Sequence, residues 1–172
     1  TTEETATTAP VYGTPAVLAK NIDVTITPVY REGKLHASNA MVRNTKRVDG
    51  YTLSANVDKV AHDVQAIILG RTEDSNGVQI VKGSNAPPKV AVGFACTLDD
   101  GSKELWWLYK GEFSEPTKSA KTDGENIEYQ TPTLEANFVR RMNDDALAAV
   151  VDTSNEDIGE DVGSGWFTTV YA

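Results

Sequence analysis

Apolar and polar residues alternate along several stretches of the chain, which is the pattern of β-strands with one buried and one exposed face. The first stretch covers residues 22–27, where isoleucine and valine alternate with aspartate and threonine. The same pattern recurs over residues 51–58 and 90–96. In the third stretch the second face consists of small residues, which predicts a closely packed strand with Cys96 in the core.

Turn sequences separate these stretches. The sequence DDGS at residues 99–102 predicts a tight hairpin that joins two antiparallel strands, one ending near Leu98 and the next starting near Lys103. Asn-Gly at 76–77 and Asp-Gly at 123–124 predict further turns. A long strand is predicted over residues 125–140, with a bulge or an edge position at Pro132, where the apolar phase changes.

One stretch has helical periodicity. Residues 59–69 place Val60, Val64, Ile67 and Ile68 on one face, with Asp58 as the predicted cap and Gly70 as a left-handed stop. The predicted fold is therefore an antiparallel β-sandwich or barrel with this helix packed across one opening. Residues 1–10 are predicted to form a flexible N-terminal arm, and residues 11–172 a single domain.

Composition and charge narrow the function. The chain has 172 residues, enough for one domain with a core of its own. Cys96 is its single cysteine, so no internal disulfide and no cysteine-based metal site is expected, and no apolar run reaches membrane-span length. Residues 122–172 hold 2 Lys/Arg against 11 Asp/Glu, which accounts for the whole net charge of −9. We therefore expect a soluble protein that does not grip nucleic acid.

Residues that carry chemistry are scarce. His36 and His62 are both interpreted as surface residues, and no phosphate loop, nucleophile elbow or paired-histidine motif is present. Acidic residues between positions 152 and 161 depart from the calcium-loop pattern, so a solvated loop is the preferred interpretation. We predict no enzymatic activity, no cofactor and no metal.

Two adjacent tryptophans raise a packing question. Trp106 and Trp107 lie in one predicted strand, so their side chains point to opposite faces and cannot share a core layer. One of them needs a cover. Either a segment of the same chain or a neighbouring subunit can supply it, since large aromatic side chains favour interface cores.

Nearly the whole chain resembles the major tail proteins of long, flexible-tailed bacteriophages. The resemblance rests on IDVTITPVYREGKL (22–35), DKVAHDVQAIILG (58–70), a long run from Val90 to Arg141, and the closing WFTTVY (166–171). The most specific part is LYKG…FSEP…KT…IEYQTPT between Leu108 and Thr133.

The resemblance implies a structural subunit of the virion tail, assembled in the host cytoplasm. Such subunits have a β-sandwich with one flanking helix and form hexameric rings that stack into a tube for DNA ejection. The implied partners are other copies of the chain and further tail proteins (tape measure, tail tip and terminator), with DNA passing through unbound and no membrane contact.

Assembly contacts are predicted in two long connections, residues 31–50 and 111–124, because long loops in compact domains tend to carry function. The candidate subunit-interface residues are Arg43, Lys46, Arg47, Trp106, Trp107, Lys118 and Lys121. The candidate channel-lining acids, which would repel DNA phosphates, are Asp23, Glu125 and Glu128. The alternative for each of them is that it keeps the outer surface of the tube soluble. For the basic cluster in the first connection, a plain solvated loop is the alternative.

Two other classes of function stay open on the residues alone. A monomeric β-sandwich that binds carbohydrate or protein fits the composition equally well, and it predicts a stable monomer at any concentration. A catalytic β-domain fits least, since it needs paired carboxylates that the sequence does not place in space.

Overall fold

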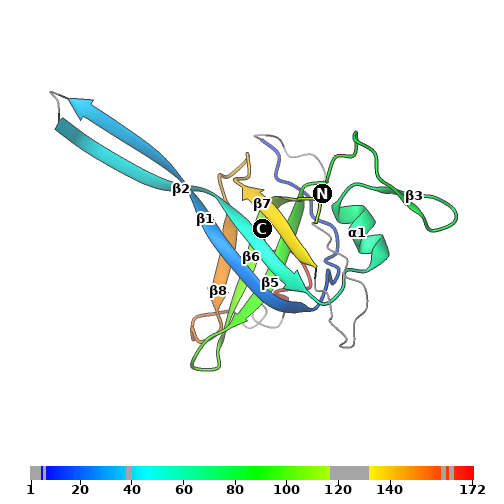
Figure 1. Ribbon diagram of the computed structural model, residues 1–172. Helices are drawn as coiled ribbons and strands as arrows, with labels where there is room; N and C mark the ends of the chain where they lie inside the picture. The colour runs from blue at the N-terminus through cyan, green and yellow to red at the C-terminus, as the bar shows by residue number, and fades with distance from the viewer. Residues whose placement is uncertain (1–4, 6, 38–39, 117–131, 160–161, 163–164) are drawn as a thin grey trace, which may run out of the picture.

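The computed structural model describes residues 5, 7–37, 40–116, 132–159, 162 and 165–172. Strands dominate it, as the alternation predicts, and one short helix accompanies them (Figure 1). In chain order the elements are β1 (Asn21–Ala37), β2 (Ala40–Val57), α1 (His62–Ile68), β3 (Thr72–Glu73), β4 (Gln79–Ile80), β5 (Val90–Thr97), β6 (Lys103–Phe113), β7 (Thr133–Val139) and β8 (Ala148–Asp152).

The main sheet is antiparallel and curls into a half-barrel (Figure 1). Its strand order is β1-β2-β7-β6-β5, and β8 also pairs with β6. Along β6, residues 104–108 pair with β8 and residues 111–113 pair with β7, while β5 follows the other edge. The two short strands β3 and β4 form a separate hairpin after α1. This architecture confirms the mainly-β sandwich or barrel class.

The inner face of the curled sheet carries the larger core. Alternate residues of β2 and β7 point inward and are buried, because the period of a strand places every second side chain on one face. Part of α1 and the segment at Leu18 and Ala19 pack against them. The buried members of this inner core are Leu53, Ala55, Val57, Ile68, Leu69, Phe94, Leu108, Phe113, Leu134, Ala136 and Phe138.

The outer face has a smaller core centred on β6, with Ala91 of β5 and Ala149 and Val151 of β8 packed against it. Leu105, Trp107 and Tyr109 are buried there, and Trp166 from the C-terminal segment covers them. Tyr12 from the N-terminal segment and Val170 pack at its margin. The C-terminal aromatic segment therefore docks back onto the domain.

A register shift in β6 changes which of its residues after Leu108 face the inner core. Val92 pairs with Leu108 and Val90 with Gly111, so β6 has one more residue than β5 between these pairs. Phe113, although an odd number of residues from Leu108, consequently faces the same inner core. Gly111 lies against the ring of Phe138, with no room for a side chain.

Two of the three turn predictions are confirmed, and the third, Asp-Gly at 123–124, lies outside the described residues. The hairpin at residues 99–102 joins β5 to β6, with Gly101 at φ 84°. Gly77 closes the β3–β4 hairpin at φ 77°, and Gly70 ends the helix region at φ 62°. These positive φ angles are the conformation that glycine adopts at no steric cost.

The predicted helix start was wrong. The N-cap is Ala61, without a side-chain cap, and Asp58 Oδ1 instead accepts a hydrogen bond from the Lys59 backbone N–H at 2.6 Å. The predicted helix face also needs correction, because Ile67 is 65% exposed and Ala66 is buried. The segment before His62 runs extended, which shifts the helix phase relative to the core.

The connection predicted over residues 31–50 is not a loop. β1 and β2 continue through it to Ala37 and Ala40, so most of it is a long hairpin. Part of the strand predicted over residues 125–140 is observed as β7, while residues 125–131 lie outside the described part of the chain.

We expect Gly111→Ala to destabilise the fold. An added Cβ would lie 2.3 Å from Cε1 of Phe138, whose side chain is 1% exposed and held by the inner core. Such overpacking costs about 1–3 kcal/mol of the free energy of unfolding, which chemical denaturation measures. Gly13→Ala is the matched control, because no atom lies within 4 Å of its Cβ position. Equal stability of the two variants would contradict the expectation.

Candidate assembly and channel surfaces

The most prominent feature is an arm formed by residues 30–37 of β1 and 40–48 of β2. The last pairing of β2 with β7 joins Gly50 to Val139, and beyond that row β1 and β2 pair only with each other in the described chain. Figure 1 shows this two-stranded arm (blue and cyan) projecting far from the body. No other described element packs along its length, so the arm has both faces open to solvent or to another molecule.

The arm is basic. Residues 30–48 contain five Lys/Arg (Arg31, Lys34, Arg43, Lys46 and Arg47) against Glu32 alone, a net charge of +4. The Lys46 ammonium lies 4.0 Å from the centroid of the Tyr30 ring, and Arg47 is exposed opposite Arg31. The side chain of Arg43 lies outside the described part. Lys46 and Arg47, predicted in a loop, therefore lie on one strand of a two-stranded hairpin.

The second feature is a polar face on the outside of β1, β2 and β7. Directly paired residues of an antiparallel sheet share a face, so three rows can be read across these strands. In these three rows every outward position is hydroxyl, amide or acidic and none is Lys or Arg, whereas the next row toward the arm, Val29, Gly50 and Val139, is apolar. The rows are Asp23, Asn56 and Thr133; Thr25, Ser54 and Glu135; and Thr27, Thr52 and Asn137.

Side chains tie this polar face together. Thr52 Oγ1 donates to Asn137 Oδ1 at 3.1 Å, and Thr133 Oγ1 donates to Asn56 Oδ1 at 2.7 Å. Within the described chain no segment packs over it. Asp23, one of the predicted channel acids, lies on this face and is exposed, whereas Glu125 and Glu128 lie outside the described residues.

The two tryptophans occupy opposite faces, as predicted. Trp106 is half-buried on the inner side, stacked on Phe94 with 6.1 Å between ring centroids, and its indole N–H donates to Glu104. Trp107 is 4% exposed and donates from Nε1 to the Trp166 backbone carbonyl at 2.9 Å. Its own C-terminal segment therefore covers Trp107 and leaves almost none of that ring exposed, and the interface role predicted for it stays a prediction.

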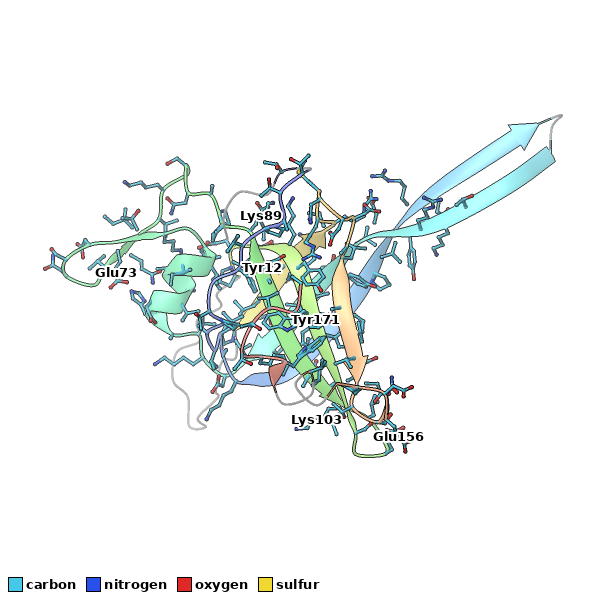
Figure 2. The ribbon with its side chains drawn as sticks, turned by 180° about the vertical axis from the view of Figure 1, so that it is seen from behind. Tyr12, Glu73, Lys89, Lys103, Glu156 and Tyr171 are labelled. Atoms are coloured by element: carbon cyan, nitrogen blue, oxygen red, sulfur yellow. The ribbon has the colours of Figure 1, made fainter. Side chains whose placement is uncertain are left out.

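Acidic residues gather at an end of the body away from the arm, where the β5–β6 turn and the segment after β8 meet (Figure 2). The Thr153 backbone N–H donates to Lys103 O, and the Lys103 N–H donates to Thr153 Oγ1, both at 2.8 Å. Hydrogen bonds from Ser102 hold the pKa of Asp100 below its usual range. We call this surface the acidic end; it consists of Asp99, Asp100, Asp152, Glu156 and Asp157.

An apolar crevice of about 550 Å³ opens between the two edges of the half-barrel. The walls of this crevice include the N-terminal segment around Leu18, strand β5 and Ile67 of α1.

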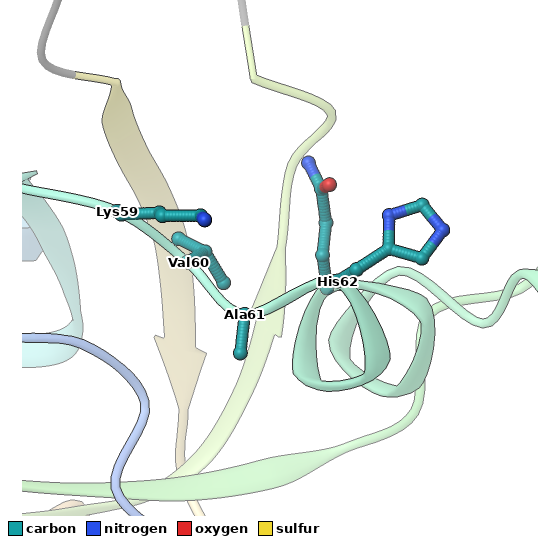
Figure 3. A pocket seen from close by; sticks show the side chains of 5 residues that line it. Lys59, Val60, Ala61 and His62 are labelled. Carbon is teal, nitrogen blue, oxygen red and sulfur yellow. The ribbon is translucent and has the colours of Figure 1, made fainter.

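A shallower hollow lies at the start of α1, lined by Lys59, His62 and Gln65 among others (Figure 3). His62 is exposed as predicted, and its Nε2 lies 3.1 Å from the Gly77 carbonyl oxygen, so the ring is tied to the β3–β4 hairpin.

Chemistry-bearing groups do not converge in the described residues. No group of three or more His, Cys, Asp or Glu side chains there is arranged to hold a metal ion. Cys96 is half-buried, and burial together with the nearby Glu104 raises the pKa of its thiol, which disfavours the reactive thiolate. The described part also contains no helix with the length and apolarity of a membrane span.

A buried arginine fastens both terminal segments to the sheet. The guanidinium of Arg141 stacks 4.0 Å from the Tyr109 ring centroid and forms a two-bond pair with Asp144. Tyr109 Oη donates to the Tyr171 carbonyl oxygen at 2.6 Å, and the ring of Tyr12 lies 6.4 Å from that of Tyr109. Burial raises the pKa of Tyr109, and the hydrogen bonds from Arg141 lower the pKa of Asp144.

The sequence anticipated some of these features and missed others. It identified the basic cluster, Asp23 and the acidic segment after β8, but not the arm or the Arg141 network. Lys118 and Lys121 lie outside the described residues, so their predicted interface role stays a prediction. The signal for the polar face was present as the Thr, Ser and Asn positions of the alternating stretches.

Comparison with known proteins provides one match. A family model described as phage tail tube protein matches residues 11–156, which is most of the chain. A search of curated proteins found no match.

We expect Asp144→Asn to lower stability near neutral pH and to matter less in acid. Because the folded-state pKa of Asp144 lies below 3.8, its ionised form stabilises the fold above that pH, and the contribution is lost as pH falls through the lowered pKa. The decrease in the free energy of unfolding should be below about 1 kcal/mol, since the Asp144 side chain is 38% exposed. Thermal melts of both proteins from pH 7 to 3 measure the difference between their melting temperatures, with Asp157→Asn as the charge control. A difference that grows in acid would refute this account.

Proposed function

The chain belongs to the phage tail tube protein family, and we propose that its copies close into hexameric rings that stack into the DNA-ejection tube of a long, flexible tail. Family membership makes the protein a structural subunit of the tail tube and places it in the virion tail. The observation that carries the finer proposal is the arm.

An isolated two-stranded hairpin is marginal in water, and the arm lacks a supporting layer in the described chain. Its strands are nevertheless long, and they pair along the arm with one register shift between Leu35 and His36. A neighbouring subunit that packs against the arm supplies the missing layer, and the acidic end offers carboxylates for Lys46 and Arg47. Contacts between an arm and a different surface are heterologous, which is the geometry of rings and open stacks.

The sheet edges support closure of a ring. Neither the outer edge of β1 nor that of β5 is paired with another strand of the described chain. Unpaired edges attract further strands, so soluble proteins cover or pair them. In a ring, each subunit edge lies beside an edge of the next copy, and the backbone groups along it gain partners.

The polar face suits the wall of a DNA channel. Its hydroxyl and amide groups are hydrated without attracting phosphate, and its acids Asp23 and Glu135 repel it over about 8 Å at physiological salt. A channel must let DNA move, so the lack of Lys and Arg in the three rows of this face favours low friction. We assign this face to the channel, with Glu125 and Glu128 kept as candidates.

Further tail proteins are expected to contact the two ends of the stack. A tube with an arm at one end of each subunit and a different surface at the other end has distinct termini. We propose that tail-tip and terminator proteins bind these ends and that the tape measure protein occupies the channel before ejection.

Electron microscopy of the purified protein over a concentration series tests the assembly proposal. We expect rings or hollow tubes with sixfold end views, because the arm and sheet edges gain partners only between subunits. A species that stays monomeric in this series and also in the presence of tail-tip protein would refute the proposal and favour a monomeric binding module.

In the same assay, Lys46→Glu with Arg47→Glu should abolish or strongly reduce assembly, since the net charge of the arm would fall from +4 to 0 and carboxylates would replace the two cations expected to meet the acidic end. Lys59→Glu with Lys82→Glu makes the same charge change on the body and is the matched control. Normal tubes from the arm variant would remove the arm's basic residues from the interface.

Thiol labelling of assembled tubes tests the channel assignment. With Cys96→Ala as background, Thr27→Cys puts a thiol on the polar face, and Thr72→Cys puts one on exposed β3. In tubes, Thr27→Cys should react with a small maleimide but not with one coupled to a large polymer, whereas Thr72→Cys should react with both. Blocking of both reagents at position 27 would indicate an interface, and reaction with both would indicate the outer surface.

A further inference from the structure

The base of the arm is a β-bulge. Val29 pairs with Gly50 and Tyr30 pairs with Val48, so Asp49 is an extra residue of β2 without a partner in β1. A bulge bends its strand and strengthens the local twist. This one lies next to the row in which β7 ends, since Gly50 also pairs with Val139.

The carboxylate of Asp49 binds two arginines from different strands. Arg31 Nη2 donates to Oδ2 at 3.1 Å, and Arg140 Nη2 donates to Oδ1 at 3.1 Å. Arg31 belongs to β1 within the arm, whereas Arg140 directly follows β7 in the body. Arg140 is itself held by Asp145, which accepts from Nη1 at 2.8 Å. One side chain thus links all three strands that meet at the base.

Backbone packing fixes the row below the bulge. A Cβ on Gly50 would lie 2.4 Å from the Phe138 carbonyl oxygen, so β2 and β7 approach too closely there for any other residue. Above this row the arm is a two-stranded ribbon, and such ribbons vary widely in twist. Asp49 lies between the row of Gly50 and Val139, which backbone packing fixes, and the two-stranded arm, which nothing else in the described chain supports. The direction of the arm is therefore set at Asp49.

We propose that Asp49 is a positioning residue that sets the direction of the arm relative to the sheet. Its two arginines hold the bulge from both sides, one from the arm and one from the body. Asp49 makes no contact with the tip of the arm and acts through the geometry of the base. The use of this direction, to bring the arm onto a neighbouring subunit, rests on the proposed function.

Distance measurements between spin labels on dispersed subunits test the inference. The labels go on Gly33→Cys in the arm, where no atom lies within 4 Å of the Cβ position, and on exposed Thr97→Cys at the end of β5, with Cys96→Ala as background. We expect one narrow distance peak in this parent. In Asp49→Asn, arm directions outside that peak should become roughly fivefold more populated.

Asp23→Asn is the matched control, since it makes the same charge change on β1 away from the bulge and should leave the peak unchanged. Replacement of both arginines (Arg31→Gln with Arg140→Gln) should reproduce the broadening. A parent without a narrow peak, or an Asp49→Asn peak as narrow as the parent's, would overturn the inference. Because the subunits are dispersed, this result is independent of tube formation, and a failure to form tubes would count against the proposed function alone.

Discussion

The structure depends on which parts of the two faces of one curled sheet are buried and which parts are left exposed. Curling buries the inner face against α1 and the N-terminal segment, and this burial supplies most of the apolar contact in the fold. The outer face cannot be buried by the same curl. Over β6 it is covered by Trp166 and its neighbours, and over β1, β2 and β7 it is left bare and made hydrophilic.

This division of the outer face separates stability from assembly. The covered half holds both terminal segments through Tyr109 and Arg141, so these contacts belong to the subunit itself. The bare half and the arm contribute little to the subunit core. Their residue types are consistent with the assembly and channel roles that we propose for them.

Much of the fold could be predicted because local signals agreed. The hairpin at Asp99–Ser102 and the left-handed Gly70 follow from turn chemistry, and the opposite directions of Trp106 and Trp107 follow from strand geometry. The arm could not be predicted because both of its faces are open. With no dry side, its sequence shows no alternation of apolar and polar residues, and charged residues in such a segment are typical of a loop.

The candidate surfaces were predictable only in part, for a topological reason. Alternation shows that Thr25 and Thr27 share a face, but not that β2 and β7 lie beside them. The pairing of β2 with β7 joins residues about eighty positions apart, and no local signal encodes it. The role of Asp49 could not be predicted for a similar reason, because its partners are Arg31 in β1 and Arg140 directly after β7, neither of which is close to it in the sequence.

The register shift in β6 has a consequence for cooperativity. Since Leu108 and Phe113 face the inner core while Trp107 and Tyr109 face the outer one, a single strand is a structural member of both. Displacement of β6 from the sheet would therefore expose residues of both cores at once, which couples the stability of the two cores through this one strand.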